Sequence, residues 1–494
     1  MSERAPLNIL HIFTDQHRFD AIGAHGHPCI RTPHIDRLIR EGVSFQRAYS
    51  PSPECVPARS SMITGYYPGR AGCYGNGYDM PPEDTPTFMS RLRDAGYHTH
   101  GVGKCHFTPD THALRGFVSR ETQEELPKDR TRDDYNRNLI ERDYGWILEP
   151  HGVRGEMYYI PQPSLLPERD HPSRWIGDRS VDFIQTHVDS ARPWYLYSSF
   201  IHPHPPFAPP VPWHKLYRGP QMPLPDIPDN SDELITFINR LQNRFKYRDR
   251  GGHDLNLIRQ LRAYYYACIS FIDAQVGRML EALEKSGQLD RTLIVFSADH
   301  GDYLGDFGSF GKRGMHDVSA RVPMICRWPD QALAGTRPDT PVSLVDLAPT
   351  FLETAGIAFK SADFDGVPLR SVAEGKTKRE RVFSQYEQGP NGLYMTVEKR
   401  WKYIYSATDQ KEFLFDLESD AKEHHNLAPC AEHAATLDRM RRHCIDLVRS
   451  QGQQNALTDD GRWKTHPVRR LPADLDYALN FQDPRWWDGK LPEW

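Results

Sequence analysis

Short apolar runs alternate with amphipathic stretches from the N-terminus to about residue 355. Asn8 to Thr14, Trp194 to Ile201 and Leu293 to Ser297 are apolar runs of strand length. Runs that are apolar on both faces are typical of parallel strands covered by helices on either side. The alternation therefore predicts an α/β fold, with a large, mixed, mostly parallel sheet sandwiched between helices.

The strongest helical pattern lies at residues 257–285. Apolar side chains recur there at steps of three or four, which is the spacing of one helix face. They are Ile258, Leu261, Tyr265, Cys268, Ile272, Val276, Met279 and Leu283. Shorter patterns predict helices over Pro33 to Glu41 and Thr87 to Ala95, each followed by a glycine.

Residues 1–360 are predicted to form one catalytic α/β domain. Two stretches within it, 107–175 and 202–256, are polar, arginine-rich or proline-rich and lack clear periodicity. Loops of this length in a compact domain usually border a functional site. We expect both stretches to form its rim.

The pattern changes after residue 360. Residues 361–380 read as a connection, and 381–450 as a smaller antiparallel α+β subdomain. Its expected elements are strands at 381–386, 393–397, 401–406 and 412–416 and a helix near 431–450. Residues 451–494 read as an extended aromatic tail. Its last segment, 478–494, holds three tryptophans, and we expect it to pack across a neighbouring subunit of a homo-oligomer.

Charge and cysteine usage narrow the class of protein. The net charge is −5, which argues against binding to nucleic acid or to a membrane surface through bulk charge. The sequence has no apolar run of 18 residues and no leader pattern at its N-terminus, so a cytoplasmic location is expected. Its eight cysteines include no Cys-x-x-Cys pair, which favours reduced thiols over a structural zinc site.

Reactive side chains follow four of the predicted strands. Since functional groups collect at the carboxyl ends of parallel strands, we expect these clusters to share one edge of the sheet. They are Asp15 with Gln16, Lys104 with His106, His202 with His204, and Asp299 with His300. Each alone could be a helix cap or a surface residue, but four together predict a site.

The segment CVPARSSMITG, from Cys55 to Gly65, carries the most specific signal. It can be an ordinary helix start with an early proline. As chemistry, a helix N-terminus and Arg59 one turn later would lower the pKa of the Cys55 thiol and attract an anion.

This segment resembles the signature of the formylglycine-dependent sulfatases of the alkaline-phosphatase superfamily, Cys-x-Pro-(Ser/Ala)-Arg followed by Thr-Gly. The resemblance extends to TPHIDRLIREG near the N-terminus, to residues 298–329 and to FLFDLESDAKEHHNLA at 413–428. It implies the alkaline-phosphatase-like fold. It also implies that a formylglycine-generating or sulfatase-maturing enzyme oxidises Cys55 to Cα-formylglycine. One hydroxyl of the aldehyde hydrate then attacks the ester, and the other expels the sulfate.

The resemblance also implies a divalent metal. Its ligands would be Asp15, Gln16, Asp299, His300 and the modified Cys55. Such an oxygen-rich set suits Ca²⁺ best, with Mg²⁺ or Mn²⁺ as alternatives. Many relatives carry a second Asp in place of Gln16 and an Asn in place of His300. The Asp-Gln and Asp-His version resembles the bacterial cytosolic branch that includes choline sulfatases and phosphonate monoester hydrolases.

A cationic pocket for the ester is implied in the same way. It comprises Arg59, Lys104, His106, His204 and Lys312. Asn76 matches a substrate-contacting Asn of the choline-sulfatase-like branch. For His202, His214, Lys215 and His316 a structural role is expected instead.

The predicted function is hydrolysis of a small sulfated substrate to an alcohol and inorganic sulfate. The alternative is a phosphonate monoester or phosphodiester hydrolase with the same nucleophile. A third possibility is an anion-binding protein in which Cys55 is never converted. Lys104 and His106 favour sulfate, since the phosphonate hydrolases of this branch carry uncharged hydroxyl side chains at these two positions.

Overall fold

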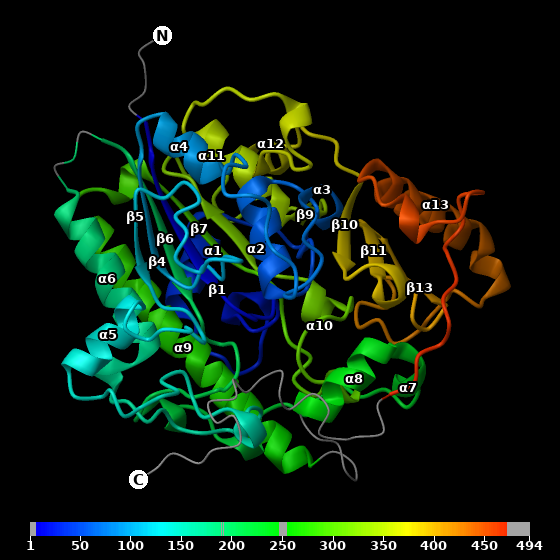
Figure 1. The fold of residues 1–494 in the computed structure, drawn as a ribbon, viewed down its shortest axis with the longest axis horizontal. Coiled ribbons are helices and arrows are strands. Elements are labelled where there is room, and N and C mark those ends of the chain that lie inside the picture. Colours follow the sequence, from blue (N-terminus) through cyan, green and yellow to red (C-terminus); the bar gives the residue numbers. More distant parts are fainter. Residues whose placement is uncertain (1–5, 189, 191, 247–253, 472–494) are drawn as a thin grey trace.

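The computed structural model describes residues 6–188, 190, 192–246 and 254–471. Its centre is a sheet of seven strands in the order β2-β8-β7-β1-β6-β4-β5 (Figure 1). The strands are β1 (Asn8–Thr14), β2 (Val43–Ser44), β4 (His98–Gly103), β5 (Ser119–Thr122), β6 (Trp194–Phe200), β7 (Thr292–Ala298) and β8 (Met324–Arg327). The strands β7, β1, β6, β4 and β5 are parallel, while β8 and β2 run antiparallel to their neighbours. The mixed, mostly parallel sheet predicted from the sequence is confirmed.

Helices cover both faces of this sheet. On one face lie α1 (Pro33–Glu41), α6 (Pro172–Thr186) and α9 (Leu255–Lys285); on the other lie α2 (Cys55–Thr64), α4 (Phe88–Asp94) and α11 (Leu347–Thr354). The alternation of side chains along β1 explains the two layers. Leu10 and Ile12 pack into the core shared with α9, whereas Ile9 and Phe13 pack into the core shared with α2. Both faces of β1 are therefore apolar.

A second, four-stranded antiparallel sheet lies beside the first (Figure 1). It consists of β10 (Arg381–Tyr386), β11 (Leu393–Glu398), β12 (Trp401–Ser406) and β13 (Lys411–Asp416), with α13 (Ala434–Ser450) packed on it. The predicted C-terminal strands and helix are present at these positions. At the junction with the rest of the molecule, the buried Lys402 Nζ lies 2.6 Å from Glu423 Oε1 and also pairs with Asp317.

The remaining elements are short. They are α3 (Pro68–Ala71), α5 (Asp134–Glu141), α7 (Ser231–Leu234), α8 (Phe237–Lys246), α10 (Asp317–Ala320), α12 (Leu369–Ala373) and the two-stranded pair β3 (Ala48–Tyr49) and β9 (Val342–Ser343). The prediction that residues 107–175 and 202–256 are irregular is wrong where β5, α5, α7 and α8 lie. The sequences of these elements are polar and lack the apolar periodicity from which a helix or strand is predicted. For example, β5 has the sequence SRET and, among the described strands, pairs with β4 at the edge of the sheet. The tail segment 478–494 lies outside the described residues.

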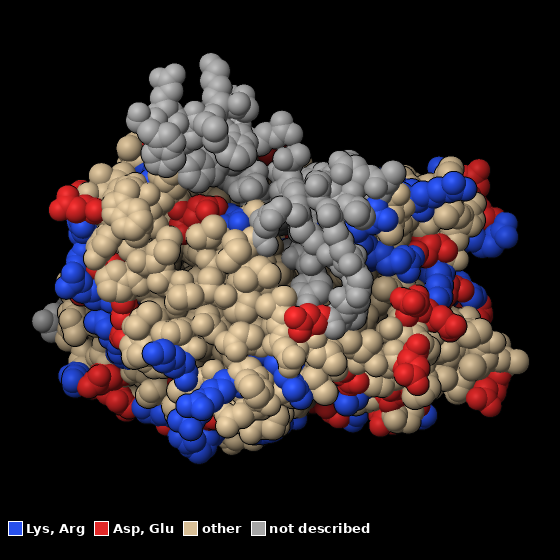
Figure 2. Space-filling model, turned by 90° about the horizontal axis from the view of Figure 1, so that it is seen from below, with Lys and Arg blue, Asp and Glu red and all other residues tan. Residues whose placement is uncertain are grey.

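Among the described residues, none of the helices combines the length and the apolar character needed to cross a membrane. Figure 2 shows the face at the bottom of Figure 1, with acidic and basic side chains interspersed around its margin.

Candidate active site

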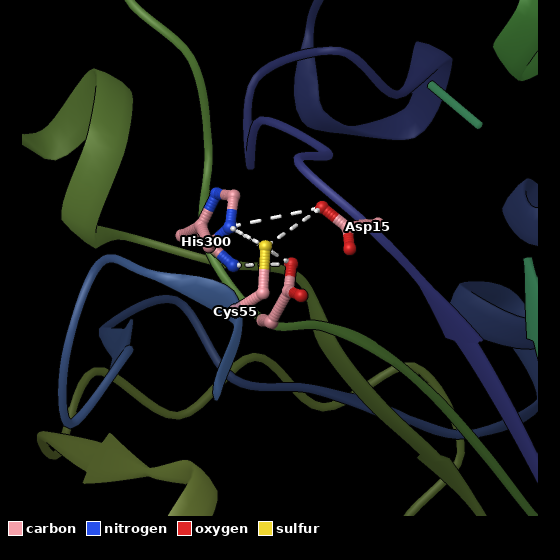
Figure 3. Close-up of side chains that lie close together, drawn as sticks. Asp15, Cys55 and His300 are labelled. Carbon is pink, nitrogen blue, oxygen red and sulfur yellow. Dashed lines mark hydrogen bonds and ion pairs between the residues drawn. The ribbon is translucent and has the colours of Figure 1, made fainter. Parts of the chain in front are cut away.

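The four strand-end clusters and the start of α2 meet at one edge of the large sheet. Asp15 follows β1, Lys104 follows β4, and Asp299 with His300 follows β7. Cys55 is the first residue of α2. Figure 3 shows Asp15, Cys55 and His300 pointing toward one another from these separate elements. The predicted common edge is confirmed for Asp15, Lys104, His204, Asp299 and His300 by their contacts and the shared cavity, whereas the side chain of His202 stacks on His171.

Four side chains form a compact, buried ligand cluster. The ligand atoms of Asp15, Cys55, Asp299 and His300 all lie within 4.8 Å of one another. His300 Nε2 is 3.4 Å from Cys55 Sγ and 3.5 Å from the nearer carboxylate oxygen of Asp299. Two carboxylates, an imidazole and a thiol at this spacing can surround one ion.

The proton on His300 is placed by the backbone. Its Nδ1 lies 3.0 Å from the carbonyl oxygen of Gly301, which can only accept a hydrogen bond. Nδ1 therefore carries the proton, and in the neutral ring the lone pair of Nε2 faces the carboxylates. A hydrogen bond from one ring nitrogen to a carbonyl oxygen is typical of an imidazole that binds a metal through its other nitrogen.

Gln16 lies next to the cluster, where its backbone N–H donates to Asp299 Oδ1 at 3.0 Å. Its side-chain nitrogen donates to Tyr159 Oη at 3.2 Å and to the carboxylate of Asp302. Its side-chain oxygen is buried and has no hydrogen-bond partner in the described structure. A buried acceptor without a partner is costly unless a ligand satisfies it. Asp302 and Tyr159 thus orient Gln16 so that its oxygen can serve a cation.

The two carboxylates of the cluster repel each other. Burial and the charge of Asp15 raise the pKa of Asp299. Burial also acts against the ionised form of Asp15, but Lys104, His204, Lys312 and Arg59 hold the pKa of Asp15 well below its ordinary value. A divalent cation would remove this repulsion, and the oxygen-rich donor set fits one.

Arg59 lies behind the ligands and does not face the pocket. Its guanidinium donates to Asp15 Oδ2 at 3.1 Å and to Asp299 Oδ2 at 3.2 Å. It also donates to the carbonyl oxygen of Lys104 and to the hydroxyls of Tyr197 and Ser199. These contacts hold the outer oxygens of both carboxylates. The structure places Arg59 as a support for the cluster, whereas the sequence analysis expected it among the cations that meet the ester.

The thiol of Cys55 lies against Lys312. Lys312 Nζ is 2.7 Å from Cys55 Sγ, and both side chains are buried. Burial and Asp15 disfavour the thiolate, but Lys312 and Lys104 outweigh them and hold the pKa of Cys55 well below its ordinary value. The position of Sγ is therefore one where negative charge is stabilised.

A second carboxylate, Glu125, lies on the opposite side of Lys104. Lys104 Nζ is 2.8 Å from Asp15 Oδ2 and 2.7 Å from Glu125 Oε2. Glu125 also pairs with Arg154 and lies 3.3 Å from His204 Nδ1. Lys104 and His204 are among the residues predicted from the sequence, whereas Glu125 and Arg154 are not. Their only signal was their position in the polar range expected to form the rim.

The cluster opens into a cavity of about 550 Å³. Its wall includes the predicted residues Cys55, Asn76, His106, His204 and Lys312 together with Glu125 and Arg154. Asn76 Oδ1 accepts a hydrogen bond from the Val56 backbone N–H at 2.9 Å, so this side chain also caps α2. The volume suits a small ligand.

The four residues expected to be structural lie elsewhere. His202 stacks on His171, and His316 stacks on Phe307 in the core below the second sheet. His214 contacts Tyr264, and Lys215 is exposed. His202 and His316 are thus held by core packing.

Two family models and several known proteins match this chain. A family model described as Sulfatase matches residues 7–357, and one described as N-sulphoglucosamine sulphohydrolase, C-terminal, matches residues 305–450. The chain is 31% identical to an arylsulfatase of Clostridium perfringens, covering 94% of this chain and 98% of that protein. It is 32% identical to a choline-sulfatase of Rhizobium meliloti, covering 85% and 82%.

A similar solved structure is the phosphonate monoester hydrolase of Agrobacterium radiobacter. It superposes with a TM-score of 0.78 at 25% identity, covering 94% of this chain and all of the other. The named relatives and this structural neighbour are thus two sulfatases and a phosphonate monoester hydrolase.

Proposed function

The chain belongs to the sulfatase family and is a sulfuric ester hydrolase, and we propose that it cleaves a small sulfate monoester to an alcohol and inorganic sulfate, with Cys55 converted to formylglycine as its nucleophile. The observation that carries this proposal is the contact of Lys312 Nζ with Cys55 Sγ at 2.7 Å beside the four-ligand cluster. The sulfur atom occupies the place that a hydroxyl oxygen of the formylglycine hydrate would take.

The residues present fit a divalent cation, with Ca²⁺ as the first choice. Asp15, Gln16, Asp299 and His300 would hold it together with the modified Cys55. The unpartnered oxygen of Gln16 and the lone pair of His300 Nε2 support this set. When bound, the ion would polarise the ester and stabilise negative charge on the nucleophile.

The chain's own cations support the rest of the reaction. Lys312 lies on the nucleophile atom, where its charge favours the deprotonated form. Lys104 is fixed between two carboxylates beside Cys55 and can stabilise charge on the ester oxygens. His106 and His204 line the cavity that Cys55 also lines, and we expect them to lie next to the leaving group. Arg59 keeps both metal-binding carboxylates in place.

The proposal requires two partners. The first is a formylglycine-generating or sulfatase-maturing enzyme that converts Cys55. The second is a small sulfated substrate, which the cavity of about 550 Å³ supports. Among the two named sulfatase relatives, one acts on choline sulfate by its name, and the other on aryl sulfates.

The runner-up is hydrolysis of a phosphonate monoester, favoured by the fold of the Agrobacterium radiobacter enzyme. The buried ammonium of Lys104 favours sulfate, because a sulfate monoester needs strong electrostatic help at its oxygens.

One experiment tests both. A sample is first shown by mass spectrometry to carry converted Cys55, which makes the peptide about 18 Da lighter. We expect kcat/KM for an aryl sulfate to exceed that for the matched phosphonate monoester, and Cys55→Ala to lose several orders of magnitude on both. Cys73→Ala, a change at a buried core cysteine, is the control and should retain the ratio. A converted wild type that prefers the phosphonate would replace our proposal with the runner-up. A Cys55→Ala variant with a tenth of the wild-type rate would exclude the nucleophile.

A further inference from the structure

Glu125 is a mostly buried carboxylate on the wall of the cavity that contains the nucleophile. Its side chain is 13% exposed and follows β5 by three residues. It contacts three cationic or basic side chains that border the nucleophile: Lys104, His204 and Arg154. Although burial acts against ionisation, these three groups hold the pKa of Glu125 well below its ordinary value. Glu125 therefore carries a negative charge.

This charge is not needed for the ligand cluster. The ions Asp15 and Asp299 are already held by Arg59, and Lys104 already pairs with Asp15 at 2.8 Å. Glu125 adds a second anion to Lys104 and also contacts His204 and Arg154, which lie near Asp15 and Glu149 respectively. Its effect is to reduce the positive charge that this wall of the cavity presents to an incoming ester.

A sulfate monoester and a phosphate monoester have the same tetrahedral shape but differ in charge. The sulfate group carries one negative charge, whereas the phosphate group carries nearly two above pH 7, because its second pKa is about 6. Shape and size cannot separate the two esters. The balance of charge around the ester can, since specificity is a difference between two binding free energies.

We propose that Glu125 is a specificity-determining residue that makes the site select singly charged esters over doubly charged ones. The inference rests on the proposed function, because it takes the cavity next to Cys55 as the place where the ester binds. An ester bound in this cavity is repelled by Glu125 more strongly when it carries two charges than when it carries one, because Coulomb repulsion is proportional to the charge.

The test compares 4-nitrophenyl phosphate with 4-nitrophenyl sulfate at pH 8, using converted enzyme loaded with its metal. In Glu125→Gln the side chain keeps its size and an acceptor oxygen but loses the charge. We expect the ratio of kcat/KM for phosphate over sulfate to rise by roughly tenfold or more relative to wild type. A ratio that stays within about twofold of wild type, in a variant that still cleaves sulfate, overturns the proposal.

A matched control is Glu121→Gln, the same substitution on β5 itself. Glu121 pairs with Arg179 and His100, away from the cavity. Its ratio should equal that of wild type, and a rise as large as in Glu125→Gln would show a general effect and overturn the proposal.

A second variant covers the case in which Glu125→Gln fails to fold. Arg154→Gln removes a positive charge from the same group of contacts, so the ratio should fall. An unchanged or increased ratio in Arg154→Gln would overturn the proposal. If converted wild type cleaves neither ester, the proposed function itself fails, and this outcome is recognised before any variant is measured.

Discussion

His204 shows how the backbone decides what a titratable side chain can do. Its Nδ1 lies 2.7 Å from the carbonyl oxygen of Pro205, so the proton sits on Nδ1. Burial lowers the pKa of His204 to about 4, and Lys312 acts in the same direction, while Glu125 and Asp15 oppose it. The free enzyme therefore holds His204 neutral at pH 7, with Nε2 available as an acceptor.

This charge state predicts the pH profile. The pH dependence of kcat/KM reports the groups of the free enzyme. Since a group with a pKa of about 4 stays neutral from pH 5.5 to 9, His204→Asn should lower kcat/KM by a similar factor across that range. The measurement is kcat/KM for an aryl sulfate from pH 5.5 to 9 in both proteins. A break near pH 6.5 that is present in wild type and absent in His204→Asn would contradict it.

Individual site residues could be predicted where an apolar strand and a sequence motif indicate the same position. Asp15, Lys104 and Asp299 follow apolar strands, so their common edge follows from the parallel sheet. Glu125 and Arg154 come from polar sequence without periodicity, and only their mutual ion pair reveals their role. The orientation of a side chain likewise could not be predicted from the sequence. Gln16 depends on Tyr159 and Asp302, which lie 143 and 286 residues away in sequence.

At the scale of elements, the two sheets are joined by a buried charge. Lys402 on β12 reaches Asp317 at the start of α10 and Glu423 beyond β13. It is fully buried, so its removal takes away the cation that Glu423 contacts and leaves Asp317 with Arg321 at 3.4 Å. Breaking such a buried group costs far more than breaking a surface pair.

Lys402→Met should therefore lower the free energy of unfolding by about 3 kcal/mol. The control is Lys399→Met, the same substitution in the neighbouring turn, where Lys399 and Asp339 form an exposed pair. That change should cost less than about 1 kcal/mol. Denaturant unfolding of both variants checks the difference, and equal stabilities would show that the buried group does not hold the sheets together.

Elements were predictable in proportion to their apolar character. β1 and β6 are buried along their whole length, and their bounds follow the sequence closely. The edge strand β5 and the helix α5 could not be predicted, because contacts with neighbouring elements, rather than their own apolar pattern, stabilise them. Asp133, for example, caps α5 by accepting from the Asn136 N–H at 2.9 Å.

At the scale of the whole molecule, the ligand cluster links distant segments of the chain. Asp15, Cys55 and Asp299 come from three separate parts of the sequence. An ion that binds only the folded chain stabilises it by about 2.7 kcal/mol when its free concentration is 100 times Kd. Chelation should lower the Tm of the wild type, and added Ca²⁺ should restore it.

The control for this prediction is Asp299→Asn, which removes one charged ligand and the repulsion with Asp15. Its Tm should respond little to the same additions, as followed by differential scanning calorimetry. A wild-type Tm that does not change on complete removal of divalent ions would contradict the metal site.

The burial of α2 has a consequence for the biogenesis of the enzyme. All ten residues of α2 are buried, and Cys55 is 1% exposed at its first turn. A maturing enzyme that binds the chain on both sides of the cysteine would find the residues of α2 buried in the native state, although Cys55 lines the cavity. Under the proposed conversion, oxidation of Cys55 would have to precede the folding of α2. The rate of folding relative to oxidation, rather than affinity for the folded protein, would then decide what fraction of the molecules becomes active.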